Sequence, residues 1–229
     1  MSNVSEKISI TDHINNFVQK NRKRIFIFLG AVILLLAVFI AAVSIMGVLR
    51  NKAISGVEDF TRRYEVLRFD INEPSKEAEV ETLLNDLTGF AEKNSGYAAG
   101  RAWFIIGGIR ADKKEWQEAE NAYTGAAKAA AKTYLAPAAY FNAAAAAEEQ
   151  GNLAGAVDLY TQCVSLSALF PAAARAQFAI GRLKEAQNDK AAALEAYRGV
   201  ISGWPADTAW TNLAHSRIIL LERDEEISQ

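Results

Sequence analysis

The feature that most constrains the fold is a repeat of 37 residues in the second half of the chain. Three sets of equivalent positions keep this interval: Gly107, Ala144 and Gly181; Ala119, Ala156 and Ala193; and Tyr123, Tyr160 and Tyr197. A fixed period of between about 20 and 50 residues indicates a solenoid, in which each repeat is one structural unit that stacks on its neighbours. The repeats therefore predict one elongated domain with a continuous core.

The order of residues within a period indicates which kind of solenoid this is. The first period reads W-x-x-I-G from Trp103 to Gly107, followed by Ala119 and Tyr123. This order resembles the tetratricopeptide repeat, a pair of antiparallel helices of about 34 residues. Pro205 stands where that family closes its third period. The resemblance covers about residues 100–215 and implies an all-α solenoid whose repeats bind other proteins.

The residue types agree with paired helices. Small residues allow two helices of a hairpin to approach closely, and the tyrosines fill the space beside them. The pairs 151–152 (Gly-Asn) and 188–189 (Asn-Asp) are turn formers, placed where each hairpin must reverse. Trp210, Leu213 and Ala214 restart the pattern of a first helix. This last segment is expected to be a C-terminal capping helix, since solenoids need a cap over the exposed core.

A second feature is an uncharged apolar run at residues 25–49. As a helix it would extend about 37 Å at 1.5 Å per residue, which exceeds the roughly 30 Å hydrocarbon core of a bilayer. We therefore expect a single transmembrane helix. The alternative is a cleaved signal peptide, but the apolar part of a signal peptide is only about 7–15 residues long.

The charges flanking this run predict its orientation. Four basic residues precede it and two follow it closely: Lys20, Arg22, Lys23 and Arg24, then Arg50 and Lys52. The positive-inside rule places the N-terminus in the cytoplasm and the repeats across the membrane. Residues 51–229 hold 19 basic against 25 acidic residues. An acidic domain of this kind lacks the basic surface that nucleic-acid binding requires.

These features predict four parts of the chain. Residues 1–24 are expected to be a cytoplasmic tail and residues 25–49 the transmembrane helix. Residues 50–98 are expected to form a linking helical hairpin, broken near Pro74, and residues 99–229 a domain of three repeats plus the cap helix. The tail has apolar residues at helical spacing, including Ile10, Ile14 and Phe17, which allows either a short helix on the membrane face or a mobile tail.

No catalytic pattern is present in the sequence. It lacks a P-loop, a G-x-G-x-x-G, a G-x-S-x-G and an H-E-x-x-H motif. His13 and His215 lie at opposite ends of the chain, so they cannot form a metal site with Cys163. We expect Cys163 to be a small core residue and Glu148-Glu149 to be a solvated face. The prediction is a protein that is not an enzyme, with no cofactor, no metal and no small-molecule substrate.

The candidate partner-binding surface centres on Phe104, Phe141 and Phe178, which also keep the 37-residue interval. The resemblance implies that this position, just after the first signature residue, faces the concave groove of the solenoid. The alternative is that the three phenylalanines pack between adjacent repeats. Four polar residues nearby complete the candidate surface: Arg101, Asn142, Arg175 and Arg182.

One variant of the family clamps a peptide's terminal carboxylate with basic and asparagine side chains. Asn142 and Arg175 match two of its positions, whereas Phe104, Gly108 and Ala179 replace the others. A carboxylate clamp is therefore disfavoured, and the ligand is expected to be apolar or extended.

The layout of tail, span and repeats resembles the YfgM-like proteins. That resemblance implies the bacterial inner membrane, a periplasmic repeat domain, and association with the Sec translocon and envelope chaperones. The first hypothesis is a membrane-anchored scaffold or chaperone accessory for envelope or secretory proteins. The second is a structural subunit that docks one fixed partner in a stable membrane complex. The third is an adaptor with inverted topology that faces the cytosol.

Overall fold

The computed structural model describes residues 10–227, and every regular element in that range is a helix. The α-helices are α1 Ile10–Leu67, α2 Glu77–Lys93, α3 Gly96–Asp112, α4 Trp116–Ala129, α5 Leu135–Glu149, α6 Leu153–Leu166, α7 Ala173–Ala186, α8 Lys190–Gly203 and α9 Thr208–Ile227. Two short 3-10 helices, η1 Arg68–Asp70 and η2 Pro74–Lys76, lie between α1 and α2. The predicted all-α solenoid is confirmed.

The first helix, α1, contains the apolar run. Among the described residues, one stretch, Phe17–Asp70, has the length and the composition needed to cross a membrane. Its apolar side chains are not covered by protein, since Phe28 is 72% exposed and Leu35 is 69% exposed. A core helix of a soluble protein would bury such side chains, so the apolar run at residues 25–49 is not part of the protein's own core. The helix already includes the end of the predicted tail, where Ile14 and Phe17 are exposed.

The chain divides into two compact units, residues 1–52 and 53–229. α1 belongs to both, because it continues without interruption to Leu67. The first arm of the expected linking hairpin is therefore the end of the same helix that holds the apolar run. No proline lies between residues 49 and 67 to end the helix there.

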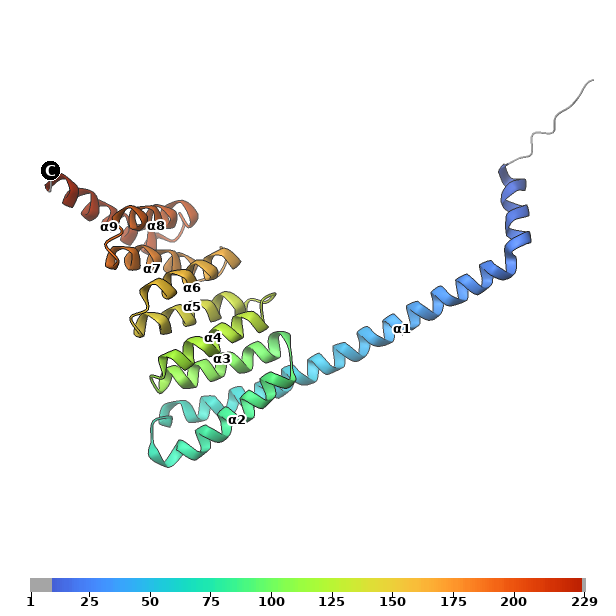
Figure 1. The fold of residues 1–229 in the computed structure, drawn as a ribbon, viewed down its shortest axis with the longest axis horizontal. Helices are drawn as coiled ribbons and strands as arrows, with labels where there is room; N and C mark the ends of the chain where they lie inside the picture. Colours follow the sequence, from blue (N-terminus) through green and yellow to red (C-terminus); the bar gives the residue numbers. More distant parts are fainter. Residues whose placement is uncertain (1–9, 228–229) are drawn as a thin grey trace, which may run out of the picture. The chain divides into compact units, whose positions relative to one another are not determined.

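Helices α2 to α9 form the solenoid. Figure 1 shows them stacked in chain order, with each helix beside the one before it. The three predicted repeats are the hairpins α3–α4, α5–α6 and α7–α8. Each hairpin buries the same small residue of its second helix, because Ala119, Ala156 and Ala193 are all 0% exposed.

The turns inside the hairpins explain why each helix pair reverses sharply. Gly151 and Asn188 have positive φ angles of 75° and 60°, which glycine and asparagine adopt more easily than other residues. Asn152 and Asp189 then cap the second helices by accepting hydrogen bonds from the backbone N–H of Gly155 and Ala192. The predicted turn formers are thus confirmed.

The close contact within a hairpin explains the small residues of the first helix. A Cβ atom added to Gly181 would lie 2.6 Å from Cε1 of Tyr197, and one added to Gly107 would lie 2.6 Å from Cδ1 of Tyr123. Tyr197 is fully buried, so its ring has little room to move away. The glycine and the tyrosine of these repeats therefore form one packing unit.

Both ends of the solenoid are closed by additional helices. At the first end, Val57 and Leu67 of α1 join Leu83 and Leu87 of α2 in a core shared with Ile105 and other residues of α3. At the other end, α9 places Ala214 against Tyr197 and Val200, with Trp210, Ile218 and Leu221 packed around them. The expected C-terminal capping helix is confirmed.

Candidate partner-binding surface

The three equivalent phenylalanines lie on the first helix of their hairpins, and each packs against the tyrosine of the same hairpin. The ring centroids are 5.2 Å apart for Phe104 and Tyr123, 5.4 Å for Phe141 and Tyr160, and 5.1 Å for Phe178 and Tyr197. These are ordinary distances for aromatic pairs. The three phenylalanines are thus held at one structural position by their repeats.

Two of the three rings also lie against the segment that follows their own hairpin. Phe141 lies 6.3 Å from the ring of Phe170, and Phe178 lies 5.4 Å from the ring of Trp210 on α9. All three phenylalanines are half-buried. Phe141 and Phe178 therefore each have one part of the ring in contact with the following segment, and all three rings keep another part open to solvent.

Two of the three basic residues of the candidate surface lie close to these rings. The guanidinium of Arg175, on α7, lies 5.1 Å from the ring centroid of Phe141 on α5. Arg101 lies 5.9 Å from Phe104, on the same helix. A cation near an aromatic face is attracted by the electrons of the ring. Arg175 is exposed, so this pair combines an accessible charge with an apolar surface.

Asn142 and Arg182 are placed differently from each other. Asn142 follows Phe141 on α5 and is half-buried. Arg182, on α7, forms an ion pair with Glu148 on α5, so its charge links two neighbouring repeats. A partner that bound Arg182 would have to compete with this carboxylate. Partner binding by the three phenylalanines and by Arg101, Asn142, Arg175 and Arg182 stays a prediction.

A polar contact that the sequence analysis missed joins the repeats. Glu148 accepts a hydrogen bond of 2.8 Å from the hydroxyl of Tyr160 and also pairs with Arg182. Glu185 does the same with Tyr197 and with Arg217 on α9. Glu148 is therefore not a solvated residue as expected, since its side chain is only 18% exposed. The available signal was the 37-residue interval between Glu148 and Glu185.

The electrostatics of this contact are clearest at Glu185. Burial would raise the pKa of its carboxyl, but the hydrogen bonds from Arg217 and Tyr197 outweigh burial and hold the pKa below its usual value. Burial and the nearby carboxylate raise the pKa of the Tyr197 hydroxyl above its usual value. The tyrosine therefore stays protonated and the glutamate charged at neutral pH.

The remaining candidates for chemistry are built into the core. Cys163 is 0% exposed, and burial raises the pKa of its thiol to about 12. A thiol of this kind is a poor nucleophile at neutral pH, which agrees with the predicted core role. Within the described part of the chain, no three His, Cys, Asp or Glu side chains gather as a metal site would require.

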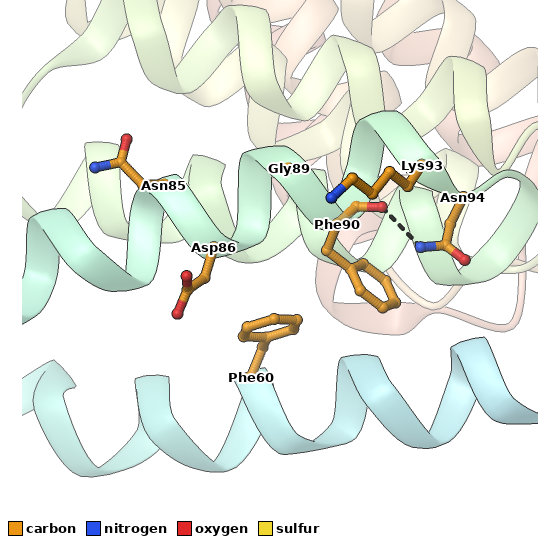
Figure 2. Close-up of a pocket in the computed structure, with 7 residues that line it drawn as sticks. All are labelled: Phe60, Asn85, Asp86, Gly89, Phe90, Lys93 and Asn94. Atoms are coloured by element: carbon orange, nitrogen blue, oxygen red, sulfur yellow. Dashed lines mark hydrogen bonds between the residues drawn. The ribbon is translucent and has the colours of Figure 1, made fainter.

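A pocket of about 390 Å³ lies between α1 and α2 and was not anticipated from the sequence. Figure 2 shows Phe60 reaching from α1 toward Phe90 on α2, and the two ring centroids are 5.3 Å apart. Asp86 and Lys93 line the same pocket. Asp86 is already paired with Arg63 at 2.8 Å. The pocket offers a shallow apolar surface and no arrangement of groups for catalysis.

Comparison with known proteins identifies the family. A family model described as tetratricopeptide repeat matches residues 137–168, which fall on α5 and α6. A TPR repeat-containing protein of Treponema pallidum (strain Nichols) is 30% identical over 223 residues, covering 91% of this chain and 92% of that protein. The chain belongs to the tetratricopeptide-repeat proteins. The resemblance inferred from the residue pattern is confirmed at this level.

The match to this tetratricopeptide-repeat relative is wider than the repeats themselves. An alignment that covers 91% of the chain must extend into α1 as well as the solenoid. A solved structure of kinesin light chain TPR-like repeats from Podosopora anserina is also similar, with 15% identity and a TM-score of 0.48 over 66% of this chain and 77% of that one.

Proposed function

We propose that this tetratricopeptide-repeat protein is a membrane-anchored scaffold that holds protein partners at the bacterial cell envelope and performs no catalysis. One observation carries the proposal: the exposed apolar stretch and the first solenoid core belong to the same helix, α1. Such a helix anchors the repeats to a bilayer through one span. The solenoid then offers a long surface for other proteins.

The chemistry of the candidate surface suggests the kind of partner. Phe104, Phe141 and Phe178 repeat along the first helices, and Arg175 adds an exposed cation beside Phe141. Aromatic and arginine side chains contribute most of the binding energy in many interfaces. We propose an apolar or extended peptide segment as the ligand, in contact with Arg101, Asn142, Arg175 and Arg182 at its polar positions.

The location of the scaffold is part of the proposal. The basic residues at 20–24 favour a cytoplasmic N-terminus and a repeat domain in the periplasm. The layout resembles the YfgM-like proteins, which supports the inner membrane, the Sec translocon and envelope chaperones as surroundings. Protease added to spheroplasts should digest the repeat domain. Digestion only in inverted vesicles would instead support the adaptor that faces the cytosol.

Crosslinking in cells tests the binding role. In one variant, a photo-crosslinking amino acid replaces Arg175. In the control, it replaces Asp158, which is exposed on α6, the second helix of its hairpin. We expect protein adducts from position 175 and few from position 158. Many secretory clients would support a chaperone accessory. The absence of adducts at position 175 would contradict the proposed surface.

A fixed subunit of a membrane complex is the second candidate. It is favoured by the capping helix α9, where Ile219 is 65% exposed and Leu213 is 48% exposed. Exposed large apolar side chains at the end of a solenoid are typical of a contact with another protein. A single stoichiometric adduct from position 175 or 219, rather than many clients, would support this candidate.

A further inference from the structure

The two ends of the helical hairpins differ in chemistry. Successive helices run in opposite directions, so the connections 94–95, 130–134, 167–172 and 204–207 lie at one end of the hairpins, here called the α2–α3 end. Two contacts confirm this grouping. The hydroxyl oxygens of Tyr97 and Tyr134 are 2.9 Å apart, and Nε1 of Trp204 donates a hydrogen bond of 2.8 Å to the carbonyl of Ala168.

Apolar side chains protrude at the α2–α3 end. Leu169 is 94% exposed, Tyr134 is 75% exposed and Leu166 is 46% exposed. The four connections at this end contain only two charged residues, Lys132 and Asp207. Exposed leucine and aromatic residues with few charges nearby are typical of a protein surface at the membrane–water interface, where the rings reach the headgroups.

The opposite end is polar at nearly all of its connections. Residues 68–76, 113–115, 150–152 and 187–189 contain eight charged residues: Arg68, Asp70, Glu73, Lys76, Lys113, Lys114, Glu115 and Asp189. This end has one large exposed aromatic side chain of its own, Phe69, which is 89% exposed. Phe69 is therefore a matched control for any effect that exposure alone would produce.

The part of α1 that belongs to the solenoid, residues 53–67, begins at the α2–α3 end. Phe60 of α1 contacts Phe90 of α2, while Arg63 pairs with Asp86, so residues 53–67 run antiparallel to α2. Ala53 is therefore level with the last turn of α2, next to the 94–95 connection. The apolar run ends at Leu49, four residues before Ala53, which is about one turn of helix.

We propose that the α2–α3 end of the solenoid is a lipid-contacting surface, with Tyr134 and Leu169 placed among the headgroups of the membrane that holds α1. The inference rests on the anchoring role proposed above. A surface tethered so close to the bilayer meets lipid at a high effective concentration, so a few exposed side chains are enough for contact. The lipid surface would fix which face of the repeats points away from the membrane, toward partners.

Fluorescence quenching in nanodiscs tests this inference with the full chain. Single variants Tyr134→Cys, Leu169→Cys and Phe69→Cys are labelled with bimane, and Leu35→Cys reports on the apolar run. The wild-type chain serves as the blank because its one cysteine, Cys163, is buried. We expect the labels at 35, 134 and 169 to be quenched by doxyl-labelled lipids, and the label at 69 to be quenched by aqueous iodide alone.

Each other outcome has a definite meaning. Quenching by doxyl lipid at 35 but not at 134 or 169 overturns the lipid-contacting surface and leaves the anchor intact. Absence of lipid quenching at 35 overturns the anchor and the inference with it. Protection from iodide at 134 and 169 without lipid quenching indicates a protein contact, such as a second copy, and also overturns the inference. Equal lipid quenching at 69 and 169 shows that the contact is not specific to the α2–α3 end.

Discussion

Tyr160 and Tyr197 each bind a carboxylate on the first helix of their own hairpin, and an arginine from the next first helix completes the contact. Both tyrosines pack against phenylalanines of the candidate surface, and Tyr197 also fills the space beside Gly181. A single side chain thus links packing inside a repeat, contact between repeats and the proposed binding surface.

The first prediction concerns Gly181, which has no room for a side chain beside the buried ring of Tyr197. Gly181→Leu should destabilise the solenoid, because overpacking of this kind typically costs about 1–3 kcal/mol. Thermal unfolding in detergent, followed by circular dichroism, should show a lower melting temperature. The control is Gly203→Leu, since nothing lies within 4 Å of a Cβ at that position. Equal melting of the two variants would contradict the packing described here.

The second prediction concerns the charge of Glu185. Its pKa in the folded chain is lower than usual, so the carboxylate adds stability above the unfolded-state pKa of about 4.3 and loses it as the pH falls through the folded pKa. The wild type should therefore melt higher than Glu185→Gln at pH 7, and the difference should shrink below about pH 4. Glu118→Gln, at an exposed residue, is the control. A difference that is constant with pH would contradict the assigned ion pair.

At the scale of elements, the solenoid is a series of hairpins in which each helix contacts mainly its neighbours in the chain. α9 covers Tyr197, Val200 and half-buried Phe178, which would otherwise face water. In repeat proteins stability is approximately a sum over repeats and the contacts between them. Loss of one terminal helix should therefore weaken the adjacent hairpin far more than the distant ones.

A chain that ends at Asp207 tests this local coupling. Without α9, hydrogen exchange in α7 and α8 should accelerate, because their core loses its cover, while α3 and α4 should keep their protection. Hydrogen exchange measured by mass spectrometry on both chains separates the two regions. Uniform loss of protection would show that the solenoid unfolds as one cooperative unit instead.

In the whole molecule, the N-terminal part of the chain is basic and the remainder is acidic. The N-terminal 50 residues hold six basic against two acidic residues, whereas the rest of the chain is acidic. The basic cluster at 20–24 is the main determinant of the proposed orientation, since Arg50 and Lys52 oppose it on the other side of the apolar run.

Neutralising that cluster should weaken the orientation. When Lys20, Arg22, Lys23 and Arg24 are all changed to glutamine, we expect a mixed population in which some repeat domains remain on the cytoplasmic side. Protease accessibility in spheroplasts and inverted vesicles measures the two fractions. The control changes four basic residues of the repeat domain that are far from the apolar run along the sequence: Lys128, Lys132, Lys184 and Arg198. An unchanged orientation would show that features other than these charges determine the topology.

The class of fold, the repeats, the turns and the capping helix could all be predicted from the amino-acid sequence. These follow from local rules, because a period of 37 residues and turn formers at fixed positions are visible in one dimension. The apolar run was equally clear, since length and lack of charge alone make it suitable for a bilayer. The same periodicity put the three phenylalanines at one structural position.

What those positions contact depends on the packing of the helices in three dimensions. The sequence could not show that Phe141 and Phe178 touch the next element as well as their own tyrosines, because their exposure depends on how hairpins stack. It also missed the role of Glu148, whose partners Tyr160 and Arg182 are 12 and 34 residues away. The pocket between α1 and α2 could not be predicted for the same reason, because its lining comes from two different helices. Contacts between residues distant in the chain depend on the packing of whole helices, which no local pattern specifies.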